Sequence, residues 1–290
     1  MAALAHVRRG PVARAAEPPD AEQLGLVAVS TRRFADLRFP QVAERVGPGA
    51  ILIQPVGAVE QHGPHLPLST DLIIAEATAE AVVAQRGDEL DLWLLPPLGY
   101  SKSNEHAWAA GSVWLSPSTV LAVLDDLGRS LAPLAARKLV FLNGHGGNSS
   151  LLNVACRELR LHHGLETFLV HPSVPPDQGG ASTEDELGMG IHAGLHETSM
   201  VLHLRPDLVE LSLGYRNVPE RLAANRHVRF GGSVTFGWLS DDFGPDGFIG
   251  DPTGATAALG EALFNAAVTI IGEQLAEVAA FSFPAKGSRG

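Results

Sequence analysis

The chain has little cysteine and few charges. A single cysteine, Cys156, in 290 residues excludes an intramolecular disulfide framework and any zinc site built from several cysteines. It suits a reducing compartment, and we expect the cytoplasm. Charged residues make up 18%, compared with roughly 25% in typical soluble proteins. We therefore expect much of the surface to be buried, either in a large core or between the subunits of a homo-oligomer.

Basic residues and long apolar runs are also scarce. Lys and Arg total 21 against 32 Asp and Glu, a net charge of −11, which argues against a nucleic-acid binder or an anionic-membrane binder. No run of 18 or more apolar residues lacks charges, so no membrane-spanning helix is expected. Residues 1–16 differ because they contain arginines and no acid. We interpret residues 1–22 as a disordered tail, with an organelle transit peptide as the alternative.

From residue 50 onward, short apolar runs alternate with segments of helical periodicity. Strands are predicted at residues 51–56, 92–95, 139–142 and 167–170. Helices are predicted at residues 71–86, 118–138 (broken or kinked at Pro133), 151–163, 193–204 and 253–281 (weakened at Gly260 and Gly272). This alternation predicts one α/β domain over residues 23–284, a three-layer αβα fold with a mostly parallel sheet. Residues 172–186 are expected to form a functional loop.

Two carboxylates and an imidazole follow the first predicted strand. Glu60 and His62 are two residues apart, so their side chains point the same way in an extended segment. Asp71 lies at the start of the next predicted helix. Such a set suits a divalent cation such as Zn, Mn or Fe. The alternative is a polar loop in which Asp71 only caps its helix.

A further imidazole is expected at the same edge of the sheet. His145 lies in residues 143–148, NGHGGN, directly after the strand at 139–142. The carboxyl ends of parallel strands meet at one edge, where open α/β sheets gather their sites. The glycines could instead cradle a phosphate, but this segment matches neither the dinucleotide-binding pattern nor the P-loop pattern.

Residues 192–199, HAGLHETS, contain more candidate ligands. His192 and His196 are four residues apart, the spacing of a metal-binding pair on one face of a helix. The alternative is a polar helix start whose side chains are satisfied by hydrogen bonds. Cys156, within the predicted helix 151–163, has no base beside it and is not expected to be a nucleophile.

Together these segments resemble the creatininase family of metal-dependent hydrolases. The resemblance runs from about residue 50 to residue 209. It rests on residues 55–67 (PVGAVEQHGPHLP), residues 70–71 (TD), residues 143–148, and HAG and ETS within residues 192–199. It implies a three-layer αβα fold, two divalent metal ions per chain (Zn, Mn or Fe) and a homo-oligomer that is often a hexamer.

The resemblance also implies roles for individual residues. Glu60, Asp71 and His145 would bind one metal ion. His62 would bind the other, with Asp71 bridging the two. The implied reaction is the attack of a metal-held hydroxide on a carbonyl carbon, since the cations lower the pKa of water. His192 would transfer the proton that reaches the leaving group.

The chain departs from creatininase proper in two places. Creatininase has a glutamate ligand of the second metal where this chain has Gly147. We therefore predict that Glu197 completes the second metal site. Creatininase also places Trp and Asp on its substrate where this chain has residues 188–191, GMGI, so creatinine itself is not expected as the substrate.

The expected substrate is a small molecule whose contacts are only partly predicted. Residues 100–106 resemble a loop that borders the substrate in the family, and Ser103 and His106 are predicted to contact it; the alternative is a solvated loop in which Lys102 and Glu105 face water. Substrate choice is assigned to loops 101–114, 172–190 and 238–249. The expected function is cleavage of a C–N bond in a small or cyclic amide. The alternatives are ring-opening C–C hydrolysis of a cyclic ketone and a catalytically silent metal-binding scaffold.

Overall fold

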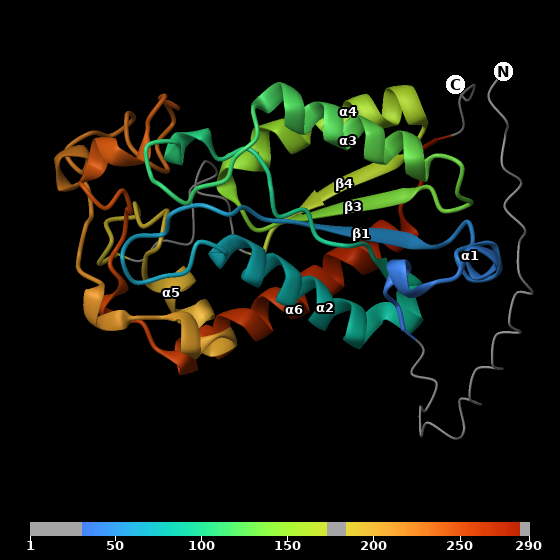
Figure 1. The fold of residues 1–290 in the computed structure, drawn as a ribbon, viewed down its shortest axis with the longest axis horizontal. Helices are drawn as coiled ribbons and strands as arrows, with labels where there is room; N and C mark the ends of the chain where they lie inside the picture. Colours follow the sequence, from blue (N-terminus) through green and yellow to red (C-terminus); the bar gives the residue numbers. More distant parts are fainter. Residues whose placement is uncertain (1–30, 173–183, 285–290) are drawn as a thin grey trace, which may run out of the picture. The chain divides into compact units, whose positions relative to one another are not determined.

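The apolar runs of the sequence form one parallel sheet in the computed structural model, which describes residues 31–172 and 184–284 (Figure 1). Within these residues the strand order is β2-β1-β3-β4, and every neighbouring pair is parallel. The strands are β1 (Ile51–Val56), β2 (Leu92–Leu94), β3 (Lys138–Asn143) and β4 (Glu166–Val170). Each boundary lies within one residue of its predicted position.

Helices cover both faces of the sheet (Figure 1). On one face lie α3 (Pro117–Leu131) and α4 (Ser149–His163), and on the other α2 (Thr70–Leu90) and α6 (Ala257–Ala280). The other two helices are α1 (Phe39–Arg45) and α5 (Leu195–Leu204), which packs against α6 and α2. The predicted three-layer αβα fold is therefore confirmed. The predicted tail at residues 1–22 and most of the predicted loop at 172–186 lie outside the described residues. The domain boundary at residue 23 stays a prediction.

Alternate residues of each strand pack against opposite helix layers. Leu52 and Phe141 belong to the apolar cluster that includes residues of α3 and α4. Ile53 and Val140 belong to the cluster formed with α2 and α6. Because the strands are buried on both faces, they appear in the sequence as continuous apolar runs rather than alternating ones.

The helix ends follow local signals in the sequence. Ser116 caps α3 by accepting a hydrogen bond from the Thr119 amide, and α3 ends at Leu131, before Pro133. The helix α6 runs unbroken through Gly260 and Gly272, and the weakening predicted there stays a prediction.

Close packing of α6 against α5 explains why residue 260 is a glycine. A Cβ there would lie 1.8 Å from the carbonyl oxygen of Ser199 in α5, so glycine lets the two helices approach closely. Among the described residues, α6 alone has the length and apolar composition of a membrane span. One face of this helix, which includes Ile271 and Leu275, is buried in the cluster beneath the sheet, and 33% of the apolar window is buried.

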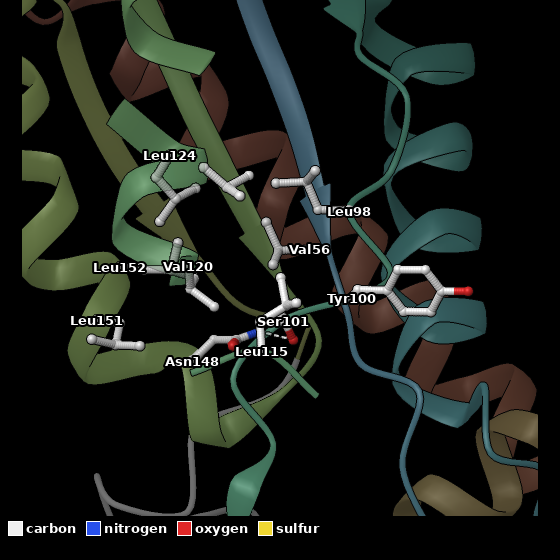
Figure 2. Close-up of a pocket in the computed structure, with 11 residues that line it drawn as sticks. Val56, Leu98, Tyr100, Ser101, Leu115, Val120, Leu124, Asn148, Leu151 and Leu152 are labelled. Carbon is white, nitrogen blue, oxygen red and sulfur yellow. Dashed lines mark hydrogen bonds between the residues drawn. The ribbon is translucent and has the colours of Figure 1, made fainter. Parts of the chain in front are cut away.

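Side chains pack closely between the end of β1 and the helices α3 and α4. A cavity of about 10 Å³ lies there between Val56, Val120 and Leu152, which is room for about one water molecule (Figure 2). Beside it, the Asn148 side chain donates a hydrogen bond to Ser101 Oγ (3.1 Å). This packing fixes the loops that leave β1 and β3 at the carboxyl edge of the sheet.

Candidate metal centre

The predicted ligands converge at the carboxyl edge of the sheet. Glu60 and His62 lie in the loop after β1, Asp71 is the second residue of α2, and His145 follows β3 directly. All four side chains are buried. The helix α2 has no side-chain cap, and the Asp71 carboxylate turns toward the imidazoles instead. The alternative in which Asp71 only caps its helix is therefore wrong.

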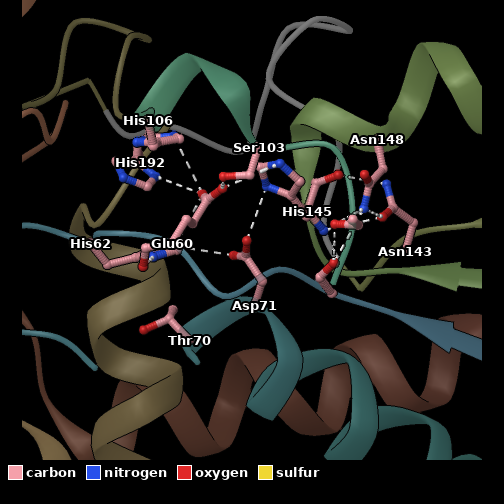
Figure 3. Close-up of polar contacts among 12 residues, drawn as sticks. Glu60, His62, Thr70, Asp71, Ser103, His106, Asn143, His145, Asn148 and His192 are labelled. Atoms are coloured by element: carbon pink, nitrogen blue, oxygen red, sulfur yellow. Dashed lines mark hydrogen bonds and ion pairs between the residues drawn. The ribbon is translucent and has the colours of Figure 1, made fainter. Parts of the chain in front are cut away.

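Asp71 meets one imidazole with each of its carboxylate oxygens (Figure 3). Its Oδ1 lies 3.1 Å from His62 Nε2, and its Oδ2 lies 3.0 Å from His145 Nδ1. The opposite nitrogens face backbone carbonyls: His62 Nδ1 is 3.2 Å from the Glu60 oxygen, and His145 Nε2 is 2.8 Å from the Lys102 oxygen. An N–H that donates to a carbonyl leaves the other ring nitrogen with a lone pair. Both imidazoles thus aim a potential metal-binding nitrogen at Asp71.

Glu60 connects these residues with the loop at 101–106 (Figure 3). Its Oε2 lies 3.3 Å from His145 Nε2, and its Oε1 lies 3.4 Å from His106 Nε2. Ser103 Oγ donates a short hydrogen bond to Glu60 Oε2. Ser103 is fully buried behind Glu60, whereas His106 lines the open cavity. Of the two predicted substrate contacts, His106 lines the cavity although its side chain is only 2% exposed, and Ser103 does not line it; the substrate contacts stay predictions.

His192 lies before α5 and not on it. Its backbone pairs with Ile249 in an antiparallel bridge, and α5 begins at Leu195. The predicted helical pair of His192 and His196 is therefore wrong. His192 Nε2 lies 2.7 Å from the Gln61 carbonyl oxygen, and its Nδ1 faces Glu60 at 3.8 Å.

Glu197 is in the first turn of α5 and is directed at the same cluster. One of its oxygens accepts a hydrogen bond from the Ala193 amide (2.6 Å). One ligand atom each of Glu197, His62 and His192 lie within 4.8 Å of one another. Burial raises the pKa of Glu197. The structure thus brings Glu197 next to the other predicted ligands, as the sequence analysis expected.

The charges of the cluster balance one another. Burial raises the pKa of Glu60 to about 8. Burial opposes a charge on His62, but Asp71 outweighs it and raises the pKa of that imidazole to about 10. His145 follows the same pattern: burial opposes its charge, while Glu60 and Asp71 raise its pKa to about 9. Burial also opposes ionisation of Asp71, but the two imidazoles outweigh it and lower its pKa.

The remaining two imidazoles behave differently. Burial and the nearby charges of His62 and His106 hold the pKa of His192 well below its ordinary value. Burial likewise lowers the pKa of His106 to about 3. Both side chains are therefore neutral near pH 7, which is the state in which an imidazole can accept a proton. At His62 and His145 a bound cation would take the place of the additional proton.

The donor set suits divalent cations. Two ligands about 2.1 Å from one cation are roughly 3.0–3.4 Å apart for angles between 90° and tetrahedral. The separations of Asp71 from His62 Nε2 (3.1 Å) and from His145 Nδ1 (3.0 Å) fall in this range. Asp71 Oδ2 is also buried, and in the described part of the chain its 3.0 Å ion pair with His145 Nδ1 lacks hydrogen-bond geometry. A buried carboxylate oxygen in that state is what a cation would satisfy.

A cavity of about 360 Å³ opens onto the cluster. Glu60, Asp71, His145 and His192 line its floor. Its outer wall is formed by residues 229–238, which include Arg229 and aromatic side chains. The sequence analysis assigned substrate choice to 238–249 and missed residues 229–237. No motif or periodicity marks that segment, so only its position in the fold identifies it.

Glu186, which no sequence motif marked as functional, holds the segment that carries His192. Its side chain is buried, and Oε1 accepts hydrogen bonds from the amides of Leu195 (3.1 Å) and Asp251 (2.8 Å). A Cβ at Gly190 or Gly194 would approach this carboxylate to 2.3–2.4 Å. Gly190 and Gly194, on either side of His192, were the signal that the sequence offered. Their missing side chains leave the space that the Glu186 carboxylate fills.

Comparison with known proteins decides the family. A sequence model of the creatininase family (creatinine amidohydrolase) matches residues 35–275. The chain belongs to the creatininase family. This membership confirms the resemblance found in the sequence, and with it the expected metal-dependent, amidohydrolase-like hydrolase.

Two relatives show how this creatininase-family member compares with named enzymes. The chain is 38% identical over 219 residues to the mycofactocin precursor peptide peptidase of Mycolicibacterium smegmatis, covering 74% of this chain and 79% of that protein. It is 32% identical over 197 residues to the creatinine amidohydrolase of Pseudomonas putida, covering 61% of this chain and 73% of that protein.

Solved creatininase structures share the fold of this family member. A Zn–Zn form of a creatininase mutant and a manganese form of creatininase superpose with TM-scores of 0.65 and 0.66, each at 24% identity. Both matches cover 86% of this chain and 98% of the other. The parallel sheet and its two helix layers are therefore those of creatininase.

Proposed function

We propose that this creatininase-family hydrolase cleaves an amide C–N bond with two divalent cations at the candidate metal centre. One cation is held by Glu60, Asp71 and His145, and the other by Asp71, His62 and Glu197. The observation that carries this proposal is the contact of each Asp71 oxygen with a different imidazole. A carboxylate flanked in this way suits a ligand that bridges two ions.

The surroundings of Asp71 support two ions rather than one. On the Oδ2 side lies His145 Nδ1, at 3.0 Å, and the Glu60 carboxylate contacts the other nitrogen of the same ring at 3.3 Å. On the Oδ1 side, His62 lies within 4.8 Å of the ligand atoms of both Glu197 and His192. Each side therefore offers a nitrogen and a further carboxylate. Zn and Mn are the ions named for the creatininase structures of this fold, and imidazole with carboxylate suits both as well as Fe.

His192 has the geometry of the proton carrier. Divalent cations, when bound, act as Lewis acids that activate water and polarise a carbonyl. His192 Nε2 lies 2.7 Å from the Gln61 carbonyl and donates its hydrogen there, so Nδ1 keeps the lone pair that faces the cluster. A neutral imidazole in this orientation accepts a proton and passes it to the leaving nitrogen. Ser103 holds Glu60 in place by its short hydrogen bond.

The cavity favours a peptide amide as the substrate. Its volume of about 360 Å³ is within the range of sites that enclose ligands of several functional groups. Arg229, Phe230 and Trp238 line it away from the cluster, so it offers a cation and aromatic surface to a substrate that extends beyond the scissile bond. The 38% identical relative is named as a precursor peptide peptidase, which agrees with such a substrate. A homo-oligomer and a cytoplasmic location remain predictions.

The proposal is tested by a substrate screen of the Zn- or Mn-loaded protein. Peptides, formamides, cyclic amides and cyclic ketones are incubated with it, and the products are identified by mass spectrometry. We expect a peptide to yield a new carboxylate and a new amine. Turnover of cyclic ketones alone would establish the C–C alternative, and two bound ions with no turnover would establish the silent scaffold.

A variant of Asp71 tests the bridging role. Asp71→Asn removes the charge that both cations share, so we expect both ions to be lost and activity to fall by about two or more orders of magnitude. Asp88→Asn is the matched control, since Asp88 is an exposed aspartate of the same helix α2. Two ions and full activity in Asp71→Asn would show that Asp71 does not bridge.

A further inference from the structure

The side chain of Gln61 lies behind the candidate metal centre without a role in the function proposed above. It is buried and does not line the cavity. Its Oε1 accepts a hydrogen bond from the Gly63 amide (2.8 Å), and its Nε2 donates one to the Gly247 carbonyl (2.8 Å). A backbone N–H can only donate and a backbone carbonyl can only accept. These two partners therefore fix which end of the Gln61 side chain is the oxygen and which is the nitrogen.

The second hydrogen of this amide identifies the tautomer of His106. Gln61 Nε2 lies 3.0 Å from His106 Nδ1 and 3.2 Å from His192 Nε2. His192 Nε2 cannot accept this hydrogen, because it donates its own to the Gln61 backbone carbonyl at 2.7 Å. The amide hydrogen therefore goes to His106 Nδ1, which must carry a lone pair. An imidazole whose Nδ1 has no hydrogen carries its hydrogen on Nε2.

The two histidines consequently present different groups to the cluster (Figure 3). His192 directs Nδ1, with its lone pair, at Glu60 Oε1 (3.8 Å). His106 directs its Nε2–H at the same oxygen (3.4 Å). By distance alone, His106 could bind a cation together with Glu60 and His192. The tautomer argues against this, since a ring nitrogen that carries a hydrogen has no lone pair for a cation.

We propose that Gln61 is a positioning residue that sets the tautomers of both histidines. Its backbone carbonyl holds the hydrogen of His192 on Nε2, and its side-chain amide holds the hydrogen of His106 on Nε2. His106 is then not a metal ligand. Its N–H compensates part of the charge of the buried Glu60 carboxylate, which is costly when uncompensated. The tautomers rest on the hydrogen bonds alone, whereas their effect on turnover rests on the proposed function.

The first test measures the tautomers by the ¹⁵N chemical shifts of the histidine rings, which differ between protonated and unprotonated nitrogens. Signals are assigned by their absence from His106→Gln and His192→Gln. We expect both residues to carry hydrogen on Nε2 in the wild-type protein. Gln61→Glu places an acceptor against His106 Nδ1, so the hydrogen should move to Nδ1.

Gln54→Glu is the matched control for this variant. Gln54 is another buried glutamine, and its amide donates to two backbone carbonyls. This control buries the same carboxylate, but His106 should keep its wild-type tautomer. Hydrogen on Nδ1 of His106 in the wild-type protein would overturn the proposal. An unchanged tautomer in Gln61→Glu would overturn it as well.

The second test asks what the His106 N–H contributes. His106→Gln can keep an N–H near the position of the imidazole Nε2, whereas His106→Leu cannot. Both variants should still bind two ions in a Zn²⁺ titration. We expect His106→Leu to lower kcat about tenfold or more with little change in KM, as for the loss of a group that supports a metal ligand. His106→Gln should retain a kcat well above that of His106→Leu.

Two results of this second test would overturn the proposal. Binding of only one ion by both variants would make His106 a ligand, and equal kcat in both would show that the N–H contributes nothing. The failure of the proposed function gives a different result. In that case the wild-type protein would bind no Zn²⁺ or cleave no amide, while its ¹⁵N spectrum would still decide the tautomers.

Discussion

Removing the Glu186 carboxylate should weaken the fold next to the metal centre. In Glu186→Ala, the amides of Leu195 and Asp251 lose the oxygen that accepts their hydrogen bonds. A hydrogen bond to a charged group contributes about 1.5–3 kcal/mol, so the two together contribute about 3–6 kcal/mol. The truncated side chain leaves room for a water molecule that can serve one amide. We therefore expect the free energy of unfolding to fall by about 3 kcal/mol.

Urea unfolding of three variants checks this value. Glu186→Gln keeps an acceptor oxygen but loses the charge, so it should lose about half as much stability as Glu186→Ala. Asp185→Ala is the matched control, because Asp185 is the exposed neighbour, and it should unfold at the wild-type midpoint. If Glu186→Ala also unfolded at that midpoint, the carboxylate would not be what joins the start of α5 to the segment at Asp251.

Three further predictions concern single side chains. Glu197→Gln should reduce metal content to about one ion per chain, measured by elemental analysis; two full-occupancy ions would show that Glu197 only orients another ligand. His65 is buried beside Thr198, and burial lowers its pKa to about 4. The unfolded chain therefore binds a proton below about pH 6.5 that the native protein does not, so stability should fall between about pH 6.5 and pH 4 by on the order of 3 kcal/mol. In urea unfolding, His65→Gln should show a weaker pH dependence than the wild type, and an equal dependence would contradict the assignment. Burial raises the pKa of the Cys156 thiol to about 11, so iodoacetamide at pH 8 should modify it at least about tenfold more slowly than free cysteine; equal rates would refute this.

The sequence by itself determined the fold class and the centre of the site. Strands buried on both faces must be apolar throughout, so β1 and β3 were visible as uninterrupted runs. The carboxyl ends of parallel strands meet at one edge, so the polar residues that follow these strands had to gather there. For this reason the order of residues along the chain was enough to place Glu60, His62 and His145 together.

Only the tertiary structure decided the features that depend on contacts between distant segments. Gly260 has low helix propensity, but its missing side chain admits the Ser199 backbone of α5. Gly147 was visible in the sequence as the loss of a ligand, but the carboxylate of Glu105 that fills its space was not. Local patterns record the periodicity and burial of one segment at a time. The space that a glycine leaves, and the side chain that enters it, are properties of two segments brought together by the fold.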